Sequence, residues 1–353
     1  MEAGPKRTPE RTAYYKEIDS DNLSPLWEVL GALVTREPKT PTQPFIWKFK
    51  KVRPAVMRAG ELITAKEAER RVLVLENPGL RGQSCITHSL YAGLQLIMPG
   101  EVAPSHRHAA SALRFIIEGK GAYTSVDGEK TIMSEGDFVI TPPWTFHDHG
   151  NDSDKPMIWM DGLDVPLVNF LDTSFMETYP EEMQPLTRPV GDAPARYSQG
   201  VVPMGYVPTQ KSSPVFNYPY ERTREALYTM SKSSDWDACH GLKVQYINPV
   251  SGDYAMPTMA TFMQLLPKGY KTAPYRSTDG MVYSPVEGRG RTIVGDTVLE
   301  WEPRDVFVIP SWMQHHHEAD DEAVLFSFSD RPVQQKLALW REQRGNEPVV
   351  RSI

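Results

Sequence analysis

The sequence predicts a mainly β protein made of two similar antiparallel barrels, preceded by a helical arm. Its 353 residues include 24 glycines and 31 prolines, which indicate many turns. Short segments of alternating apolar and polar residues, separated by Gly and Asp turns, fill residues 70–164 and return in residues 258–329. Because the second region also repeats motifs of the first, we expect a duplication of one small barrel.

The repeat is carried by two separate motifs. The first recurs 169 residues downstream and the second 168 residues downstream, an agreement that is hard to obtain by chance. The matched positions are Gly100 with Gly269, His106 with Tyr275, His108 with Ser277, Ala112 with Met281, Gly119 with Gly288, Pro142 with Pro310, Trp144 with Trp312, and His147 with His315.

Four segments follow along the chain. Around residues 8–34, Trp27, Leu30 and Leu33 recur at helical spacing after Ser24-Pro25 and predict helix. We expect a helical arm over residues 1–60, a first, catalytic barrel over 61–175, a proline-rich connecting segment with a helix near 219–232 over 176–245, and a degenerate, structural second barrel over 246–353 that ends in a polar helix from Pro332 to Gln343.

Charge and composition exclude several classes of protein. A net charge of −7 provides no basic surface for nucleic acid or an anionic membrane. Cys85 and Cys239 are the only cysteines, so we expect no disulfide framework and a reducing compartment. The first residues lack the pattern of a signal peptide, and no apolar run approaches the roughly 20 residues that span a bilayer. A cytoplasmic enzyme is therefore expected.

The segment Gly100-Glu-Val-Ala-Pro-Ser-His106-Arg-His108 predicts a metal site. Two histidines one residue apart on a strand point to the same face, roughly 6.6 to 7 Å apart along the backbone. A third histidine, His147, on a neighbouring strand would complete a cap on one side of a metal ion. The opposite positions would stay open for substrate and oxygen, as in a catalytic metal site.

The spacing of these motifs resembles that of the cupin barrel, so the resemblance implies a bicupin of two double-stranded β-helix barrels. Gly136, Pro142, His147 and Asn151 match the second cupin motif, with Trp144 in place of its central glycine. Ala112 occupies the usual glutamate position of the first motif. His106, His108 and His147 then remain as three neutral ligands, a set that suits Fe(II), Zn, Cu or Ni. An uncompensated divalent charge favours a dianionic chelating substrate.

The first barrel resembles the gentisate 1,2-dioxygenase family, which includes salicylate and 1-hydroxy-2-naphthoate dioxygenases. The resemblance rests on Arg70-Arg71, Glu76–Leu80, Leu90–Gly100, Ser111–Gly119, His147–Asn151 and Trp159–Asp164. It implies an Fe(II) enzyme that uses O2 to open a small aromatic hydroxy acid between the carboxyl-bearing and hydroxyl-bearing carbons. Gentisate would yield maleylpyruvate, in aromatic catabolism. A homotetramer is expected on the same ground.

Family resemblance also assigns substrate contacts. Arg114 lies in register with Ala112, so a regular strand points it into the barrel. There it would bind the substrate carboxylate, for which a planar guanidinium is suited. Arg70 carries over in the same way; since Arg71 is adjacent, only one of the two can face the pocket, and we favour Arg70.

One strand face and one residue pair complete the predicted site. Tyr91, Gly93 and Gln95 share a face that is expected to line the substrate pocket. Salicylate-cleaving relatives tend to carry tryptophan at the position of Tyr91, so this tyrosine favours a 5-hydroxylated ring. His149 and Asp161 resemble the family's pair beside the para-hydroxyl, where they would accept or orient its proton.

Alternatives remain open at this point. Relatives usually carry a polar pair where this chain has Ala109-Ala110, which leaves a 5-nitro or 5-halo salicylate as another substrate. Two further hypotheses concern the function. One is a non-catalytic bicupin that binds a small carboxylate, and the other is a cupin isomerase or decarboxylase that consumes no oxygen. The His315-His316-His317 run suggests a second metal site, but Tyr275 and Ser277 replace its partner ligands.

Overall fold

Two units make up the chain in this computed structural model, Met1–Lys39 and Thr40–Ile353. The structure describes residues 7–233 and 235–351. Residues 1–6, part of the segment without a signal-peptide pattern, lie outside the described residues. Within the described ranges, no helix has the length and apolar composition that crossing a membrane requires.

The N-terminal unit contains two helices where the sequence predicted continuous helix over residues 8–34. They are α1 (Pro9–Asp19) and α2 (Leu26–Leu33). Asn22 adopts a left-handed φ of 58°, and Ser24 precedes a proline, which disfavours helical backbone before Pro25. These two features end the first helix and start the second.

Residues 40–60, predicted as part of the arm, belong instead to the second unit. Strand β1 (Phe45–Trp47) pairs with a strand of the second barrel, Phe45 opposite Val308. Helix α3 (Phe49–Leu62) buries Phe49 and Val56 in the core. The sequence did not indicate the bounds of this helix, because Pro54 lies inside it and proline disfavours a helix interior.

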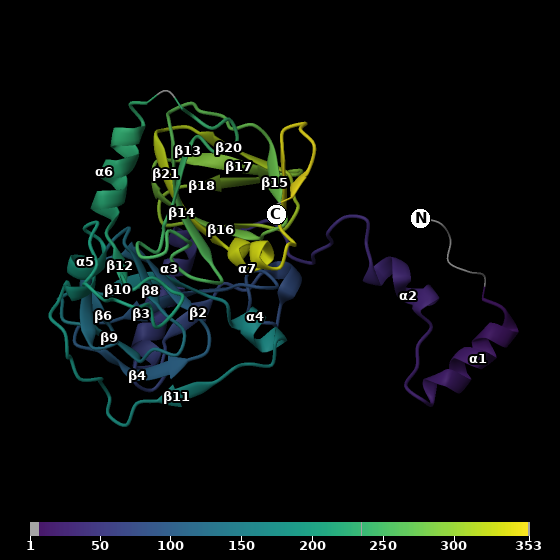
Figure 1. Ribbon diagram of the computed structural model, residues 1–353, viewed down its shortest axis with the longest axis horizontal. Helices are drawn as coiled ribbons and strands as arrows, with labels where there is room; N and C mark the ends of the chain where they lie inside the picture. The colour runs from purple at the N-terminus through teal and green to yellow at the C-terminus, as the bar shows by residue number, and fades with distance from the viewer. Residues whose placement is uncertain (1–6, 234, 352–353) are drawn as a thin grey trace. The chain divides into compact units, whose positions relative to one another are not determined.

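The first barrel consists of two facing antiparallel sheets (Figure 1). One sheet has the order β12-β8-β5-β10-β3-β2 and the other β11-β4-β9-β6-β7. Their bounds are β2 (Val72–Val74), β3 (Tyr91–Ile97), β4 (Val102–His108), β5 (Ala112–Glu118), β6 (Lys120–Val126), β7 (Glu129–Ser134), β8 (Phe138–Thr141), β9 (His147–Asn151), β10 (Met157–Leu163), β11 (Met176–Thr178) and β12 (Asn217–Tyr218). A short 3-10 helix, η1 (Pro78–Leu80), and α4 (Val165–Phe170) flank them.

The second barrel repeats this arrangement at the other end of the unit. Its sheets have the orders β1-β19-β16-β21-β14-β13 and β18-β17-β20-β15-β22-β23. The bounds are β13 (Leu242–Gln245), β14 (Ala260–Leu266), β15 (Tyr275–Ser277), β16 (Met281–Glu287), β17 (Gly290–Val294), β18 (Thr297–Trp301), β19 (Val306–Ile309), β20 (His315–Ala319), β21 (Ala323–Ser329), β22 (Arg341–Arg344) and β23 (Val350–Arg351). Between the barrels, the connecting segment contributes β11, β12, α5 (Asp192–Tyr197) and α6 (Tyr220–Met230).

The duplication is visible in matching local contacts. Trp144 and Trp312 both adopt a positive φ, 58° and 62°. The Trp144 amide donates to the His108 carbonyl at 2.8 Å, and the Trp312 amide donates to the Ser277 carbonyl at 2.7 Å. Since the same unusual backbone recurs at matched positions, the repeat in the sequence is a repeat in structure.

The barrels share a core along β5, β8 and β21. Phe115 of β5 stacks on Phe326 of β21, with ring centroids 4.0 Å apart and planes within 4°. Such a pair contributes about 0.5–1.5 kcal/mol beyond its buried area. Because neighbours on a strand point to opposite faces, Phe115 on the shared core places Arg114 inside the first barrel.

The C-terminal helix is shorter than predicted. Helix α7 spans Arg331–Lys336, and Ala338 then adopts a left-handed φ of 56°. The chain continues as β22, which pairs with β15. The predicted helix to Gln343 was therefore wrong beyond Lys336, because sheet pairing overrides helix propensity there.

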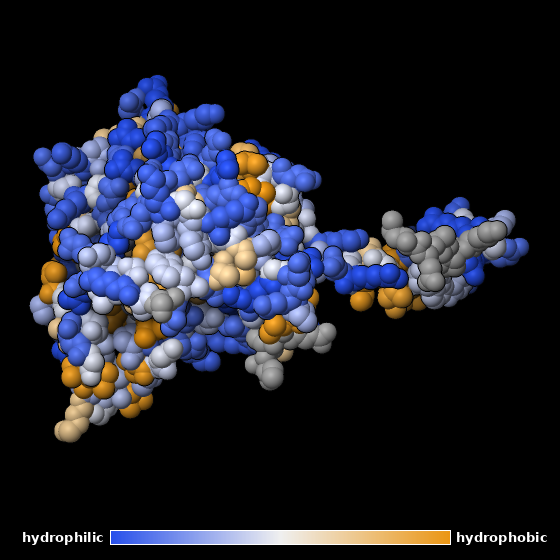
Figure 2. Space-filling model, turned by 90° about the horizontal axis from the view of Figure 1, so that it is seen from above, coloured by the Kyte–Doolittle hydropathy of each residue, from blue (hydrophilic) through white to orange (hydrophobic). Residues whose placement is uncertain are grey.

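The visible surface of the barrel unit is mostly hydrophilic, with separate hydrophobic patches (Figure 2).

Candidate active site

Three histidines converge inside the first barrel. Strand β4 carries His106 and His108 two residues apart, and β9 places His147 directly opposite His106. Their ring centroids lie 4.7 to 5.4 Å from one another. One nitrogen from each ring lies within 4.8 Å of the others, so the three side chains can hold one metal ion.

The three imidazoles are neutral, as metal ligation requires. Nδ1 of His108 lies 2.7 Å from the Ala110 carbonyl oxygen, and Nδ1 of His147 lies 3.0 Å from that of Thr145. A carbonyl only accepts, so each Nδ1 carries the hydrogen and each Nε2 offers a lone pair. Burial lowers the pKa of His106 to about 2 and of His108 to about 4, and holds the pKa of His147 well below its usual value.

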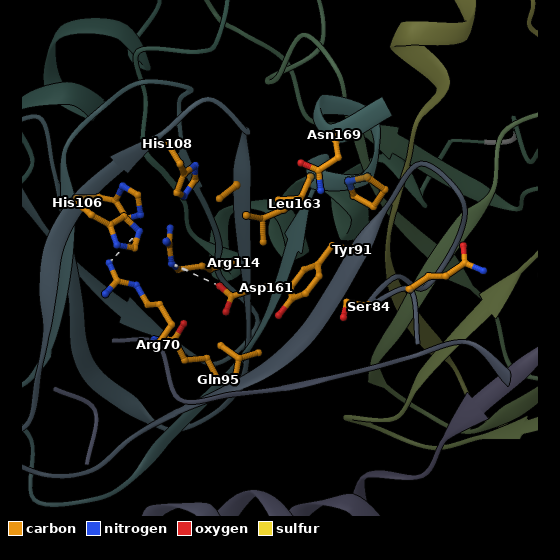
Figure 3. A pocket seen from close by; sticks show the side chains of 16 residues that line it. Arg70, Ser84, Tyr91, Gln95, His106, His108, Arg114, Asp161, Leu163 and Asn169 are labelled. Atoms are coloured by element: carbon orange, nitrogen blue, oxygen red, sulfur yellow. Dashed lines mark hydrogen bonds and ion pairs between the residues drawn. The ribbon is translucent and has the colours of Figure 1, made fainter. Parts of the chain in front are cut away.

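A cavity of about 310 Å³ opens in front of the histidines (Figure 3). Ala112 lines it where cupins usually place a glutamate, so this position adds no fourth ligand. The other lining residues are Arg70, Val72, Gln83, Ser84, Tyr91, Gln95, His106, His108, Arg114, His147, Asp161, Leu163, Val165, Pro166 and Asn169.

Arg114 is a buried cation with unused donors. Its Nη1 donates to Thr141 Oγ1 at 2.6 Å, and its Nη2 donates to His149 Nε2 at 3.1 Å. Nε lies 3.7 Å from Asp161 Oδ1, beyond hydrogen-bond distance, and has no hydrogen-bond partner among the described atoms. Burial lowers the pKa of Arg114 to about 10, partly offset by Asp161. The group stays charged, forms a long ion pair with Asp161, and keeps N–H donors that no hydrogen bond satisfies.

Arg70 reaches the cavity, whereas Arg71 is paired elsewhere. Nη2 of Arg70 lies 3.3 Å from His106 Nε2, and its Nη1 donates to the Pro104 carbonyl at 2.9 Å. Arg71 is buried and forms an ion pair with Glu101. Of the two adjacent arginines, Arg70 is therefore the one that lines the cavity.

Asp161 and Tyr91 lie side by side on one wall of the cavity, because β10 pairs with β3 and Asp161 is opposite Gly93, two residues from Tyr91 (Figure 3). Asp161 Oδ1 accepts from Trp159 Nε1 at 2.9 Å. Burial raises the pKa of Asp161 to about 6, and Arg114 counters this rise. Burial also raises the pKa of Tyr91, so its hydroxyl is neutral at physiological pH. Gln95 lies on the same strand and is 2% exposed.

Gly93 and His149 are not among the described residues that line the cavity. Gly93 lies beneath Tyr91: a Cβ there would be 2.8 Å from the Tyr91 hydroxyl oxygen and 2.4 Å from Val72 Cγ1. His149 is fully buried behind Arg114, with Nδ1 2.9 Å from Thr124 Oγ1. The structure thus places His149 against Arg114 and away from the cavity surface. The sequence analysis had instead placed it beside the para-hydroxyl of the substrate.

Several cavity residues were not predicted from the sequence. Leu163 follows Asp161 by two residues on β10, so strand periodicity could have found it. Gln83 and Ser84 come from the loop between β2 and β3, and Asn169 comes from α4. Contacts made by loops carry no periodic signal in the sequence.

In the second barrel, other residue types occupy two of the three positions that correspond to the metal-binding histidines. Tyr275 and Ser277 occupy the places of His106 and His108, and the Tyr275 and His315 rings lie 5.6 Å apart. His316 points elsewhere and pairs with Glu318 at 3.3 Å. This barrel buries His315 and His317 among tyrosine rings.

Comparison with known proteins adds near-full-length relatives. A family model described as a cupin domain matches residues 93–165. The chain is 60% identical to gentisate 1,2 dioxygenase 1 of Aquipseudomonas alcaligenes, over 97% of this chain and 98% of that protein. It is 38% identical to a gentisate 1,2-dioxygenase of Streptomyces sp, over 94% of each. A crystal structure of salicylate 1,2-dioxygenase from Pseudoaminobacter salicylatoxidans, in adducts with gentisate, superposes with a TM-score of 0.91 at 34% identity, covering 97% and 96% of the two chains.

A duplicated barrel whose first copy gathers neutral imidazoles beside a cationic cavity is the architecture of a metal-binding cupin enzyme. The similarity to gentisate dioxygenases extends over almost the whole chain, so a particular family within this class can be assigned. The chain belongs to the gentisate 1,2-dioxygenase family and is a ring-cleaving dioxygenase.

Proposed function

We propose that this protein is an Fe(II)-dependent dioxygenase that opens gentisate between its carboxyl-bearing and ortho-hydroxyl-bearing carbons, giving maleylpyruvate in aromatic catabolism. The observation that carries the substrate class is buried Arg114, whose Nε lies 3.7 Å from Asp161 Oδ1 without a hydrogen-bond partner among the described atoms, beside three neutral imidazoles. A buried guanidinium with an unused donor is costly, by about 1–3 kcal/mol, until an anion accepts from it.

The charge of the site supports a dianionic chelating substrate. Arg70 and Arg114 contribute two positive charges and Asp161 one negative charge, so the cavity is cationic before any metal is bound. A divalent ion on neutral ligands adds two more. A carboxylate with a deprotonated ortho-hydroxyl would balance this excess and present two oxygens to the metal.

His106, His108 and His147 are the residues that would hold the iron. One lone pair from each ring, on Nε2 in His108 and His147, suits a divalent transition metal, and no carboxylate among the described residues joins the group. A bound ferrous ion would supply open positions for the substrate oxygens and dioxygen and a path for electrons between them.

The two arginines are assigned to the substrate carboxylate. Arg114 offers Nε and the remaining hydrogens of Nη1 and Nη2. Arg70 donates to His106 Nε2 in this structure, so turning away from it would free one lone pair for the metal and one donor for the substrate. Together they orient the ring with its carboxyl and ortho-oxygen toward the histidines.

The wall of the cavity formed by β3 and β10 is assigned to the 5-hydroxyl of gentisate. Asp161 has its Oδ1 engaged by Trp159, and we assign Oδ2 to receive the hydroxyl proton; the pKa of about 6 lets this carboxyl accept a proton near neutrality. The neutral Tyr91 hydroxyl, with Gln95 on the same strand, supplies further hydrogen bonds.

The alternative ring substituents are less well supported. Ala109 and Ala110 are not among the described residues that line the cavity, so the loss of a polar pair there does not enlarge it. Tyr91 and Asp161 give the wall formed by β3 and β10 a polar character that suits a hydroxyl better than a halogen. A non-catalytic carboxylate-binding role leaves the convergent histidines and their open side without a purpose, and the near-full-length similarity to gentisate dioxygenases disfavours an isomerase or decarboxylase role.

Oxygen uptake after anaerobic iron loading tests this proposal. The panel contains gentisate, salicylate, 5-nitrosalicylate, 5-chlorosalicylate and 1-hydroxy-2-naphthoate. We expect one O2 consumed for each gentisate and slower reaction with the others. No uptake with gentisate alongside rapid uptake with a substituted salicylate would reassign the substrate, and no uptake with any of them would refute the dioxygenase assignment.

A homotetramer in the cytoplasm is proposed as the working form. The described part of the arm has no buried residue in α1 or α2, and exposes Leu26, Trp27, Leu30 and Leu33, apolar surface that another copy can cover. Cys85 and Cys239 are both free thiols, as suits a reducing compartment. Light scattering on the purified protein measures the assembly directly.

A further inference from the structure

A line of buried side chains runs away from the cavity behind Arg114. Arg114 Nη2 lies 3.1 Å from His149 Nε2, and His149 Nδ1 lies 2.9 Å from Thr124 Oγ1. Thr124 Oγ1 in turn lies 3.4 Å from the sulfur of Met133. All four residues are buried, so water cannot replace any of these contacts.

The chemistry of the two ends sets the direction of every bond between them. A guanidinium only donates, so His149 Nε2 accepts from Arg114 and bears no hydrogen. The imidazole hydrogen is then on Nδ1, which donates to Thr124. A thioether sulfur only accepts, so the Thr124 hydroxyl donates toward Met133 and keeps a lone pair facing His149.

The second barrel contains the same threonine–histidine pair with the opposite end group. Thr292 Oγ1 lies 2.8 Å from His317 Nδ1, at the positions matched to Thr124 and His149. Trp301 occupies the place of Met133 and donates its indole N–H to Thr292 at 3.0 Å. Tyr283 occupies the place of Arg114.

This exchange allows the reverse arrangement in the second pair. Because Trp301 donates into Thr292, the Thr292 hydroxyl hydrogen is available to His317 Nδ1, which would place the ring hydrogen of His317 on Nε2. The matched histidines of the two barrels are then expected in opposite tautomers. Only the tautomer of the first barrel presents a lone pair to an arginine.

We propose that Thr124, oriented by Met133, is a positioning residue that fixes the tautomer of His149 and so holds Arg114 in place for the substrate carboxylate. The proposal rests on the proposed function in one respect, that Arg114 binds this carboxylate. Thr124 itself is 0% exposed and is not among the described residues that line the cavity, so it acts only through the histidine.

Neutron diffraction from a deuterated crystal of the unaltered protein tests the tautomers directly, and contains its own comparison. We expect a deuteron on Nδ1 of His149 and none on its Nε2, with the reverse on His317. A deuteron on His149 Nε2, or the same tautomer in both barrels, would overturn the proposal.

Substrate binding by three variants tests the consequence. Thr124→Val keeps the side-chain shape but removes the hydroxyl, Thr124→Ser restores it, and Thr292→Val makes the matched change in the second barrel. We expect Thr124→Val to weaken anaerobic gentisate binding and raise KM about fivefold to tenfold with a smaller effect on kcat, the range for one lost hydrogen bond. Thr124→Ser and Thr292→Val are expected to bind as the unaltered protein does.

Unchanged binding in a folded Thr124→Val protein, or an equal loss in Thr292→Val, would overturn the positioning role. Failure of Thr124→Ser to restore binding would do the same. Failure of the unaltered protein to bind gentisate would instead count against the proposed function, and the deuteron positions on His149 decide the tautomer in either case.

Discussion

Replacing Arg114 by methionine is expected to abolish most of the catalytic efficiency. Methionine fills similar space but removes the charge and all five N–H donors. In the structure, Arg114 uses one donor on Thr141 and one on His149, and its Nε forms a 3.7 Å ion pair with Asp161 without a hydrogen bond, so the remaining N–H donors are assigned to the substrate. Two charge-assisted hydrogen bonds to a carboxylate, at about 1.5–3 kcal/mol each, sum to about 3–6 kcal/mol. This corresponds to a loss of about 10²- to 10⁴-fold in kcat/KM.

The assay is steady-state oxygen uptake with gentisate on protein of equal iron content. Arg114→Lys keeps the charge without the planar fork and is expected to lie between the two extremes. Arg53→Met is the matched control, because Arg53 also loses an ion pair, to Glu118 at 2.7 Å, but Arg53 is not among the described residues that line the cavity. A folded Arg114→Met protein within about threefold of the unaltered kcat/KM would refute the assignment of this arginine to the substrate.

Three further changes have distinct expected results. His106→Ala should lose iron retention and turnover together, measured by metal analysis and oxygen uptake; full activity in an iron-depleted preparation contradicts this. Gly93→Ala should lower kcat/KM about tenfold, because its Cβ would lie 2.8 Å from the Tyr91 hydroxyl oxygen and 2.4 Å from Val72 Cγ1, and unchanged kinetics would show that both side chains yield freely. Lys243→Met should stabilise the protein near pH 7 without changing activity. Burial lowers the pKa of Lys243 from 10.5 to about 7, so between these pH values the folded state binds fewer protons than the unfolded state. The stability of the unaltered protein therefore rises with pH in this range. Denaturant unfolding should therefore show that Lys243→Met raises the free energy of unfolding most at pH 7 and progressively less toward pH 10. An increase that does not depend on pH would contradict the reasoning.

Strand periodicity explains why the metal site could be predicted from the sequence. His106 and His108 are two residues apart, and alternation alone puts both rings on one face of β4. The same rule placed Arg114 inside the barrel, since Ala112 and Arg114 share a face of β5. Repetition at 168–169 residues then indicated two barrels, and showed that the second lacks partner ligands for His315.

Strand periodicity predicts which face of a strand a side chain occupies, but not whether that side chain reaches the cavity surface. This limits the prediction for His149. His147 and His149 share the inner face of β9, but His147 borders the cavity while His149 is enclosed by Arg114 and Thr124. The loop residues Gln83 and Ser84 were missed because they reach the cavity through the chain's path between β2 and β3. The bounds of α3, most of which falls within the expected helical arm, were not predicted because of its internal Pro54.

An anaerobic crystal structure of the iron-loaded protein with gentisate tests the central claim most directly. The claim predicts one iron per chain, coordinated by a nitrogen each of His106, His108 and His147, with the substrate completing two further positions and its carboxylate bonded to Arg114. Iron bound in the second barrel, a protein carboxylate among the ligands, or gentisate turned away from Arg114 would contradict it.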